Sequence, residues 1–143
     1  MNISQSIHEI FSREEVLADL FYDIFLDRHP EVQKYFVGVD LKQQAVVLTM
    51  MLSVIAEYSQ HAYPAATRYL LVLGRKHQQL GIPVDLMPNF GRCLLETLER
   101  FHGRDWNAEL RTAWQRAIAL ASQVLASGYE PEPVSSSPDT PGV

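Results

Sequence analysis

Apolar residues recur at every third or fourth position along most of the chain, which is the spacing that gathers them on one face of an α-helix. Nowhere do two short alternating segments flank a hairpin turn, so the pattern does not favour a sheet. The pattern therefore predicts an all-α fold. Helices are expected at residues 13–27, 41–60, 65–80, 85–101 and 106–127, with room for only a short helix before them.

Capping residues support the predicted starts of two of these helices. Ser12 with Glu15, and Asp40 with Gln43, have the spacing of a capping box, in which each side chain bonds to the backbone amide of the other residue. The other boundaries carry a proline, a glycine or an acidic residue that interrupts or caps a helix: Pro30, Pro64, Gly81, Pro83, Asp105 and Gly128.

The helix at residues 41–60 is the most apolar of the chain. It is apolar nearly all the way round between Ala45 and Ala56, so we expect other elements to cover it on more than one side. Polar residues interrupt it too often for a membrane span, and membrane insertion is not expected.

Length and composition are those of one globular domain. The chain has 143 residues, of which 47% are apolar and 20% are charged, and its net charge is −5. No basic cluster is longer than "GRKH", which disfavours nucleic-acid binding. The N-terminus lacks the basic start and apolar run of a signal peptide, and the lone Cys93 can form neither an internal disulfide nor a cysteine-based metal site. We expect a cytoplasmic protein.

Residues 129–143 differ in composition from the rest of the chain. They are rich in Pro and Ser and poor in apolar residues. We expect them to be disordered, either as a tail or as a linker to a further domain, and we expect the globular domain to span residues 1–128.

His77 has an unusual position for a polar residue. Ala66, Leu70, Leu73, His77 and Leu80 recur at helical steps and share one stripe, so the imidazole should point inward. It could bond to a core carbonyl. Alternatively it could bind a metal whose other ligands are not protein, because no Cys, Asp or Glu lies on the stripe within one turn. A metal held by a macrocycle needs only one histidine.

Four segments carry a family resemblance: "LFYDIFLDRHPEVQKYF", "RKHQQLGI", "FGRCLLETL" and "AWQRAIALASQVL". Together they resemble the bacterial globins, meaning single-domain haemoglobins and the globin domain of flavohaemoglobins, over about residues 10–128. The most specific feature is His29-Pro30 followed by Phe36, in agreement with Tyr22 upstream and a basic pair before His77. The resemblance implies a globin domain at residues 1–128, folded as a three-over-three helical sandwich with a shortened first helix, and haem b as its cofactor.

The resemblance also implies roles for residues around the haem. His77 corresponds to the proximal axial ligand of the iron, and Phe36 to the ring that packs against the haem face. Four apolar residues would line the proximal and inner sides: Leu73, Ile82, Phe90 and Leu94. Ordinary core packing predicts the same burial for these four, so burial alone does not separate the two roles.

On the distal side, the resemblance makes Tyr22 a hydrogen-bond donor to a gaseous ligand, Gln44 a second donor, and Leu48 a gating residue one turn further on. The alternative for Tyr22 is a half-buried ring with its hydroxyl in water. Gln43 is adjacent to Gln44, and Gln44 is preferred because it puts Leu48 rather than Val47 over the iron. Two donors predict tight dioxygen binding and slow release.

The match departs from flavohaemoglobins at two positions. Met87 stands where that family has a tyrosine, and Pro131 where it has a glutamate, and this pair strengthens the proximal histidine in that family. No reductase domain follows in the sequence, so nitric oxide dioxygenase activity would require an external reductase.

Three functions follow from these expectations. The first is reversible binding of dioxygen, NO and CO, with NO detoxification where an external reductase restores ferrous iron. The second is a haem-based gas sensor that signals through the last helix and the tail to a partner or a further domain. The third is a haem-free globin-like interaction module. A homodimer through the last two helices is left open.

Overall fold

Six α-helices and three short 3-10 helices make up the computed structural model, which describes residues 1–131. In chain order they are α1 (Ile3–Ser12), α2 (Glu14–Arg28), η1 (Pro30–Phe36), α3 (Leu41–Gln60), α4 (Pro64–Gln79), η2 (Val84–Leu86), α5 (Met87–His102), η3 (Gly103–Asp105) and α6 (Ala108–Ser127). No strand occurs in this range, and the predicted all-α fold is confirmed.

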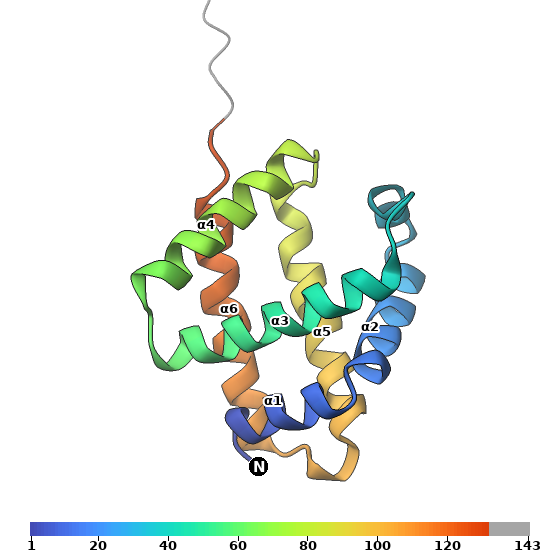
Figure 1. The fold of residues 1–143 in the computed structure, drawn as a ribbon, viewed down its shortest axis with the longest axis vertical. Helices are drawn as coiled ribbons and strands as arrows, with labels where there is room; N and C mark the ends of the chain where they lie inside the picture. The colour runs from blue at the N-terminus through green and yellow to red at the C-terminus, as the bar shows by residue number, and fades with distance from the viewer. Residues whose placement is uncertain (132–143) are drawn as a thin grey trace, which may run out of the picture.

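The α-helices pack in two layers (Figure 1). α1, α3 and α4 form one layer, and α2, α5 and α6 form the other. The layers meet where α4 and α3 cross α6 and where α2 crosses α3; Figure 1 shows α3 crossing in front of α6 and α5. Two layers of three helices confirm the predicted three-over-three sandwich, and α1, with 10 residues, is the predicted short first helix.

α4 and α6 approach so closely that backbone touches backbone. A Cβ atom on Gly74 would lie 1.9 Å from the carbonyl oxygen of Leu125, and one on Gly128 would lie 2.2 Å from the carbonyl oxygen of Leu71. Only glycine avoids these overlaps. The second half of α4, which contains His77, is therefore held directly against α6.

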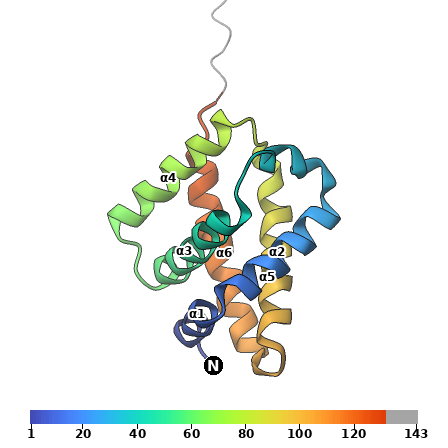
Figure 2. The same ribbon diagram turned by 45° about the vertical axis from the view of Figure 1, so that its right-hand side comes forward.

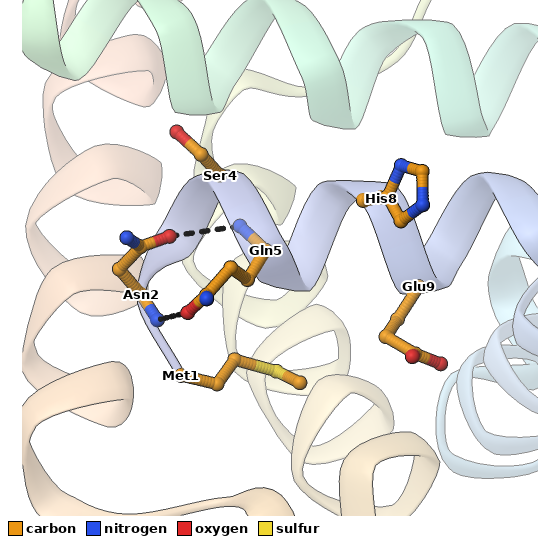
Figure 3. Close-up of a pocket in the computed structure, with 6 residues that line it drawn as sticks. All are labelled: Met1, Asn2, Ser4, Gln5, His8 and Glu9. Atoms are coloured by element: carbon orange, nitrogen blue, oxygen red, sulfur yellow. Dashed lines mark hydrogen bonds between the residues drawn. The ribbon is translucent and has the colours of Figure 1, made fainter.

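The first helix boundary differs from the prediction. Ser12 lies inside α1, where its hydroxyl donates to the Glu9 carbonyl at 2.6 Å, and α2 begins without a side-chain cap, so Ser12 and Glu15 form no capping box. The capping box lies instead at the start of α1, where Asn2 and Gln5 exchange two bonds of 2.8 Å (Figure 3). The buried face of α1 keeps the chain helical up to Ser12. The Ser12 side chain is therefore part of α1 and does not cap the start of α2.

Two other predicted caps also need correction. Asp40 does cap α3, but through the Lys42 amide at 2.9 Å and without a reciprocal bond from Gln43. Asn107 caps α6 in place of Asp105 and accepts a backbone hydrogen bond of 2.8 Å. Asp105 belongs to η3, and the chain turns once more before α6 begins.

α3 is covered on fewer sides than predicted. Leu48 and Leu52 are buried, but Val46, Val47 and Met50 are 49%, 49% and 58% exposed. A fold of two layers leaves the outer face of each layer in solvent, and on α3 this face carries Val46 and Met50 together with polar residues such as Lys42 and Glu57. No single helix in residues 1–131 is long and apolar enough to cross a membrane. η1 and α3 reach the required length and hydropathy only when taken together, and the two are bent by 105° relative to each other.

The chain after α6 is attached to the helical body. The Tyr129 hydroxyl donates to the Ile82 carbonyl at 2.8 Å. Glu130 pairs with Arg75 at 2.8 Å and bonds to the Gln78 side chain through both its N–H and its C=O. Tyr129 and Glu130 are thus held against the helical body, and residues 132–143 of the predicted tail lie outside the described residues.

Candidate functional site

A cavity of about 260 Å³ lies among α2, η1, α3, α4 and the start of α5. All predicted site residues except Leu94 line it: Tyr22, Phe36, Gln44, Leu48, Leu73, His77, Ile82 and Phe90. The other lining side chains are aliphatic, aromatic or thioether groups, with no carboxylate, ammonium or guanidinium among them. The cavity is thus apolar, with a few uncharged polar groups.

His77 lies in the last helical turns of α4 and is half-buried. Its Nδ1 atom is 2.7 Å from the carbonyl oxygen of Leu73, one turn earlier. A carbonyl can only accept, so Nδ1 carries a proton, and in the neutral ring the lone pair lies on Nε2. This is the tautomer that a metal-binding imidazole needs, with the backbone fixing the orientation of the ring.

The stripe of α4 that faces the cavity differs from the predicted one. Tyr69, Leu73, His77 and Leu80 line the cavity, whereas Ala66 and Leu70 do not. Leu70 is only 1% exposed and belongs to the hydrophobic core. An α-helix turns by about 100° per residue, so a residue one position away from the Tyr69–Leu73 row faces the core and not the cavity.

Tyr22 presents a neutral phenol to the cavity. The residue is 7% exposed, which excludes the half-buried alternative. Burial raises the pKa of Tyr22 to about 12, and an interaction with the Gln44 side chain opposes part of that rise. The hydroxyl therefore keeps its proton at neutral pH and is available as a donor.

α3 contributes Gln44 and Leu48 to the wall of the cavity. Gln44 lines the cavity, whereas the adjacent Gln43 is exposed, and the geometry agrees with the preferred register. Leu48 is 3% exposed and lies one turn further along. Val47 also lines the cavity, although it is half in solvent, because it stands at the opening.

Aromatic rings form the inner wall. Tyr22 and Phe36 pack edge to face with ring centroids 5.6 Å apart, so the two aromatic positions singled out in the sequence do meet. Phe90 packs on Phe21 at 5.1 Å. Leu94 needs correction: it is completely buried in the hydrophobic core and lies outside the cavity lining, to which Phe90, one turn earlier on α5, belongs.

The donor set fits a haem. One imidazole comes from α4, and two uncharged side chains that can donate hydrogen bonds, Tyr22 and Gln44, come from α2 and α3, so a group bound in the cavity would contact residues of all three helices. In residues 1–131 no group of three or more His, Cys, Asp or Glu side chains could hold a metal ion. The protein part of the site thus amounts to one metal ligand and two hydrogen-bond donors.

Sequence reasoning missed several lining residues. Tyr69 could have been found, since it precedes Leu73 and His77 at four-residue steps. Met51 could have been found in the same way, since it follows Leu48 by three residues and Gln44 by seven, whereas Val39 lies before α3 and carries no such signal. Met87, singled out as a substitution, does line the cavity, whereas Pro131 is exposed.

Comparison with known proteins points to one family. The globin family model matches residues 18–125. A neuroglobin of Dissostichus mawsoni is 32% identical over 66 residues, which cover 46% of this chain and 42% of that protein. A neuroglobin of Chaenocephalus aceratus matches with the same identity and coverage. These alignments span less than half the length of either relative.

Proposed function

This chain belongs to the globin family, and we propose that it binds haem b in the cavity described above and there binds dioxygen reversibly, with NO and CO as further ligands. The observation that carries the proposal is the tautomer of His77. With Nδ1 bonded to the Leu73 carbonyl, Nε2 is the free ligand atom in an otherwise uncharged cavity. When bound, haem supplies the iron that takes up the diatomic ligand.

Tyr22 and Gln44 support the choice of dioxygen. Dioxygen gains negative charge when it binds to ferrous haem, and fixed donors in a dry site stabilise such charge better than water does. Tyr22 is neutral and buried, and Leu48, which is apolar and buried, lines the same cavity. This Tyr/Gln pair also supports kinship with the bacterial globins.

Detoxification of NO in the cytoplasm is the more specific form of the proposal. It requires electrons from an external reductase. Met87, which lines the cavity, has a thioether that cannot donate a hydrogen bond, so it offers His77 no anionic or hydroxyl support. Ligand binding should therefore depend mainly on the distal donors.

A haem-based sensor is the second candidate, favoured by the chain that leaves α6. Tyr129 bonds to Ile82 and Glu130 to Gln78, so the segment after α6 is fixed to residues on either side of the turn that follows His77. A change in the position of α4 would reach that segment directly.

A homodimer is a further part of the proposal. A shallow groove between α5 and α6 is lined mainly by small and apolar residues, among them Pro88, Leu95, Ile118 and Ala126. Sedimentation equilibrium of the full chain measures whether a second copy covers this face.

Titration of the purified chain with haemin tests the proposal. We expect a Soret band that saturates at one haem per chain and shifts with CO under reducing conditions. His77→Gly should weaken uptake and recover it when free imidazole is added, whereas His61→Gly, at an exposed residue outside the cavity, should bind as the parent chain does. Absence of saturable haemin binding by the parent chain would leave the haem-free interaction module as the better function.

A further inference from the structure

A hydrogen bond joins two segments at the rim of the cavity that lie far apart in the sequence. Tyr35, near the end of η1, donates from its hydroxyl to the carbonyl oxygen of Gly81 at 3.1 Å. Phe36 and Ile82, the next residue on each side, both line the cavity. The bond therefore connects the wall that carries Phe36 to the turn that follows His77, and Figure 2 shows η1 beside that turn.

Exposed lining residues show that this bond lies at the mouth of the cavity. Val39, Val47, Tyr69 and Leu80 all line the cavity, yet they are 38%, 49%, 43% and 69% exposed. Val39 belongs to the segment that follows Tyr35, and Leu80 precedes Gly81. The hydrogen bond thus ties together the two segments that edge the opening.

The turn on one side of this bond is firmly held. Tyr129 donates to the Ile82 carbonyl at 2.8 Å, and the Gln78 side chain makes bonds of 2.6 and 2.8 Å to the backbone of Glu130. The Ile82 amide donates to the His77 carbonyl at 3.0 Å. The turn is thus fixed to the segment after α6 and to the end of α4.

The segment on the other side is loosely held. Of η1, only Val32 is fully buried, and the element packs against α2. After η1 the chain runs through Val37, which is 83% exposed, and through Gly38 with a positive φ of 77°. Few buried contacts and an exposed backbone identify the part of a fold that opens most easily. Opening of the mouth should therefore move η1 and residues 37–40 away from the turn.

We propose that the hydrogen bond from Tyr35 to Gly81 is a latch that closes the mouth of the cavity and slows the exit of its occupant. The inference rests on the proposed function in so far as that occupant is haem. Tyr35 is then a positioning residue: it holds Phe36 and the turn after His77 at their separation. Loss of one neutral hydrogen bond corresponds to about a 2- to 10-fold change in the equilibrium between closed and open states.

Tyr35→Phe tests the latch because it removes the hydroxyl and keeps the ring. In the haem-loaded chain we expect haem to transfer to an excess of a spectrally distinct apoglobin about 2- to 10-fold faster than from the parent. Tyr58→Phe is the matched control, since it removes a hydrogen bond of 2.8 Å to Thr67 outside the cavity, and its rate should equal that of the parent.

Amide hydrogen exchange of the haem-free chain gives a second readout. The Val39 amide, which donates to the Phe36 carbonyl at 3.1 Å, should exchange faster in Tyr35→Phe and at the parental rate in Tyr58→Phe. Parental rates in both measurements would overturn the latch. If the Val39 amide exchanges faster in Tyr35→Phe but the parent chain takes up no haemin, the hydrogen bond does hold η1 to the turn. The proposed function and the role of that bond in haem exit would both be refuted.

Discussion

Replacing Tyr22 by phenylalanine removes one hydroxyl from the distal wall and leaves the ring in place. The residue is 7% exposed, and its ring packs edge to face on Phe36, a contact that phenylalanine keeps. A pKa of about 12 means that roughly one molecule in 10⁵ is ionised at pH 7, so the group acts as a donor and not as a phenolate ligand.

The size of the effect follows from the charge on the ligand. A hydrogen bond to a charged group contributes about 1.5–3 kcal/mol, more than a bond between neutral partners. If Tyr22 donates to bound dioxygen, Tyr22→Phe should speed dioxygen release by about 10- to 150-fold. Gln44 remains as a second donor. If its side chain shifts to donate to dioxygen in place of Tyr22, the increase in the release rate would lie near 10-fold, the lower bound of about 10- to 150-fold.

Stopped-flow displacement of dioxygen by excess CO measures the release rate. Tyr58→Phe is a matched control, because Tyr58 is also 7% exposed but lies outside the cavity, and its release rate should be unchanged. Release from the parent chain should not vary between about pH 6 and 10, since a phenol with a pKa of about 12 stays protonated there. A change below about 3-fold in Tyr22→Phe, or faster release as pH rises through 8, would refute the assignment of Tyr22 as the donor.

Two further predictions concern stability. Gly74→Ala would place a Cβ atom 1.9 Å from the Leu125 carbonyl oxygen and should lower the free energy of unfolding, measured by urea titration, by about 1–3 kcal/mol. Gly91→Ala is the control: its Cβ atom would meet only the Ile118 side chain, at 3.2 Å, and its free energy of unfolding should stay close to that of the parent. Burial lowers the pKa of His102, which is also influenced by Glu9, Asp105 and Arg13, so the folded state favours the neutral ring. The free energy of unfolding should therefore fall as the pH drops below about 6.5, at no more than about 1.4 kcal/mol per pH unit. Thermal unfolding at several pH values checks this, with a flatter dependence expected for His102→Gln; an equal slope would contradict it.

Much of the fold could be predicted because it depends on periodic patterns. The apolar positions of residues 41–60 and 106–127 repeat at helical spacing, and the structure has helices there. The predicted cap at Ser12 was wrong, since local capping chemistry competes with burial of a whole helix face, and Ser12 lies within α1, whose other face is buried. The exposed outer face of α3 was missed for a similar reason: composition does not reveal how many layers a fold has.

The candidate site was predictable where a single side chain carries the chemistry. His77 stands out as a polar residue on an apolar stripe, whereas Tyr22 and Gln44 were expected only from the resemblance to globins; all three line the cavity. Leu94 carries no such signal, because an apolar residue one helical turn from Phe90 has the same pattern whether it faces a cavity or the core. The tie between Tyr35 and Gly81 was equally invisible, since a hydroxyl-to-carbonyl bond across 46 residues leaves no trace in local sequence.

The structure separates the residues that hold His77 from those that would act on a ligand, and this separation has a measurable consequence. Gly74 and Gly128 set the distance between α4 and α6, so a change there moves the helix that carries His77 and should lower stability and haemin affinity together. Tyr22 and Gln44 lie on other helices and face the cavity, and the Tyr22 hydroxyl makes no hydrogen bond to the backbone within residues 1–131. Changes to those two side chains should therefore alter ligand release while unfolding stays within about 1 kcal/mol of the parent. If Gly74→Ala weakened stability but left haemin affinity unchanged, the position of His77 would not depend on α6.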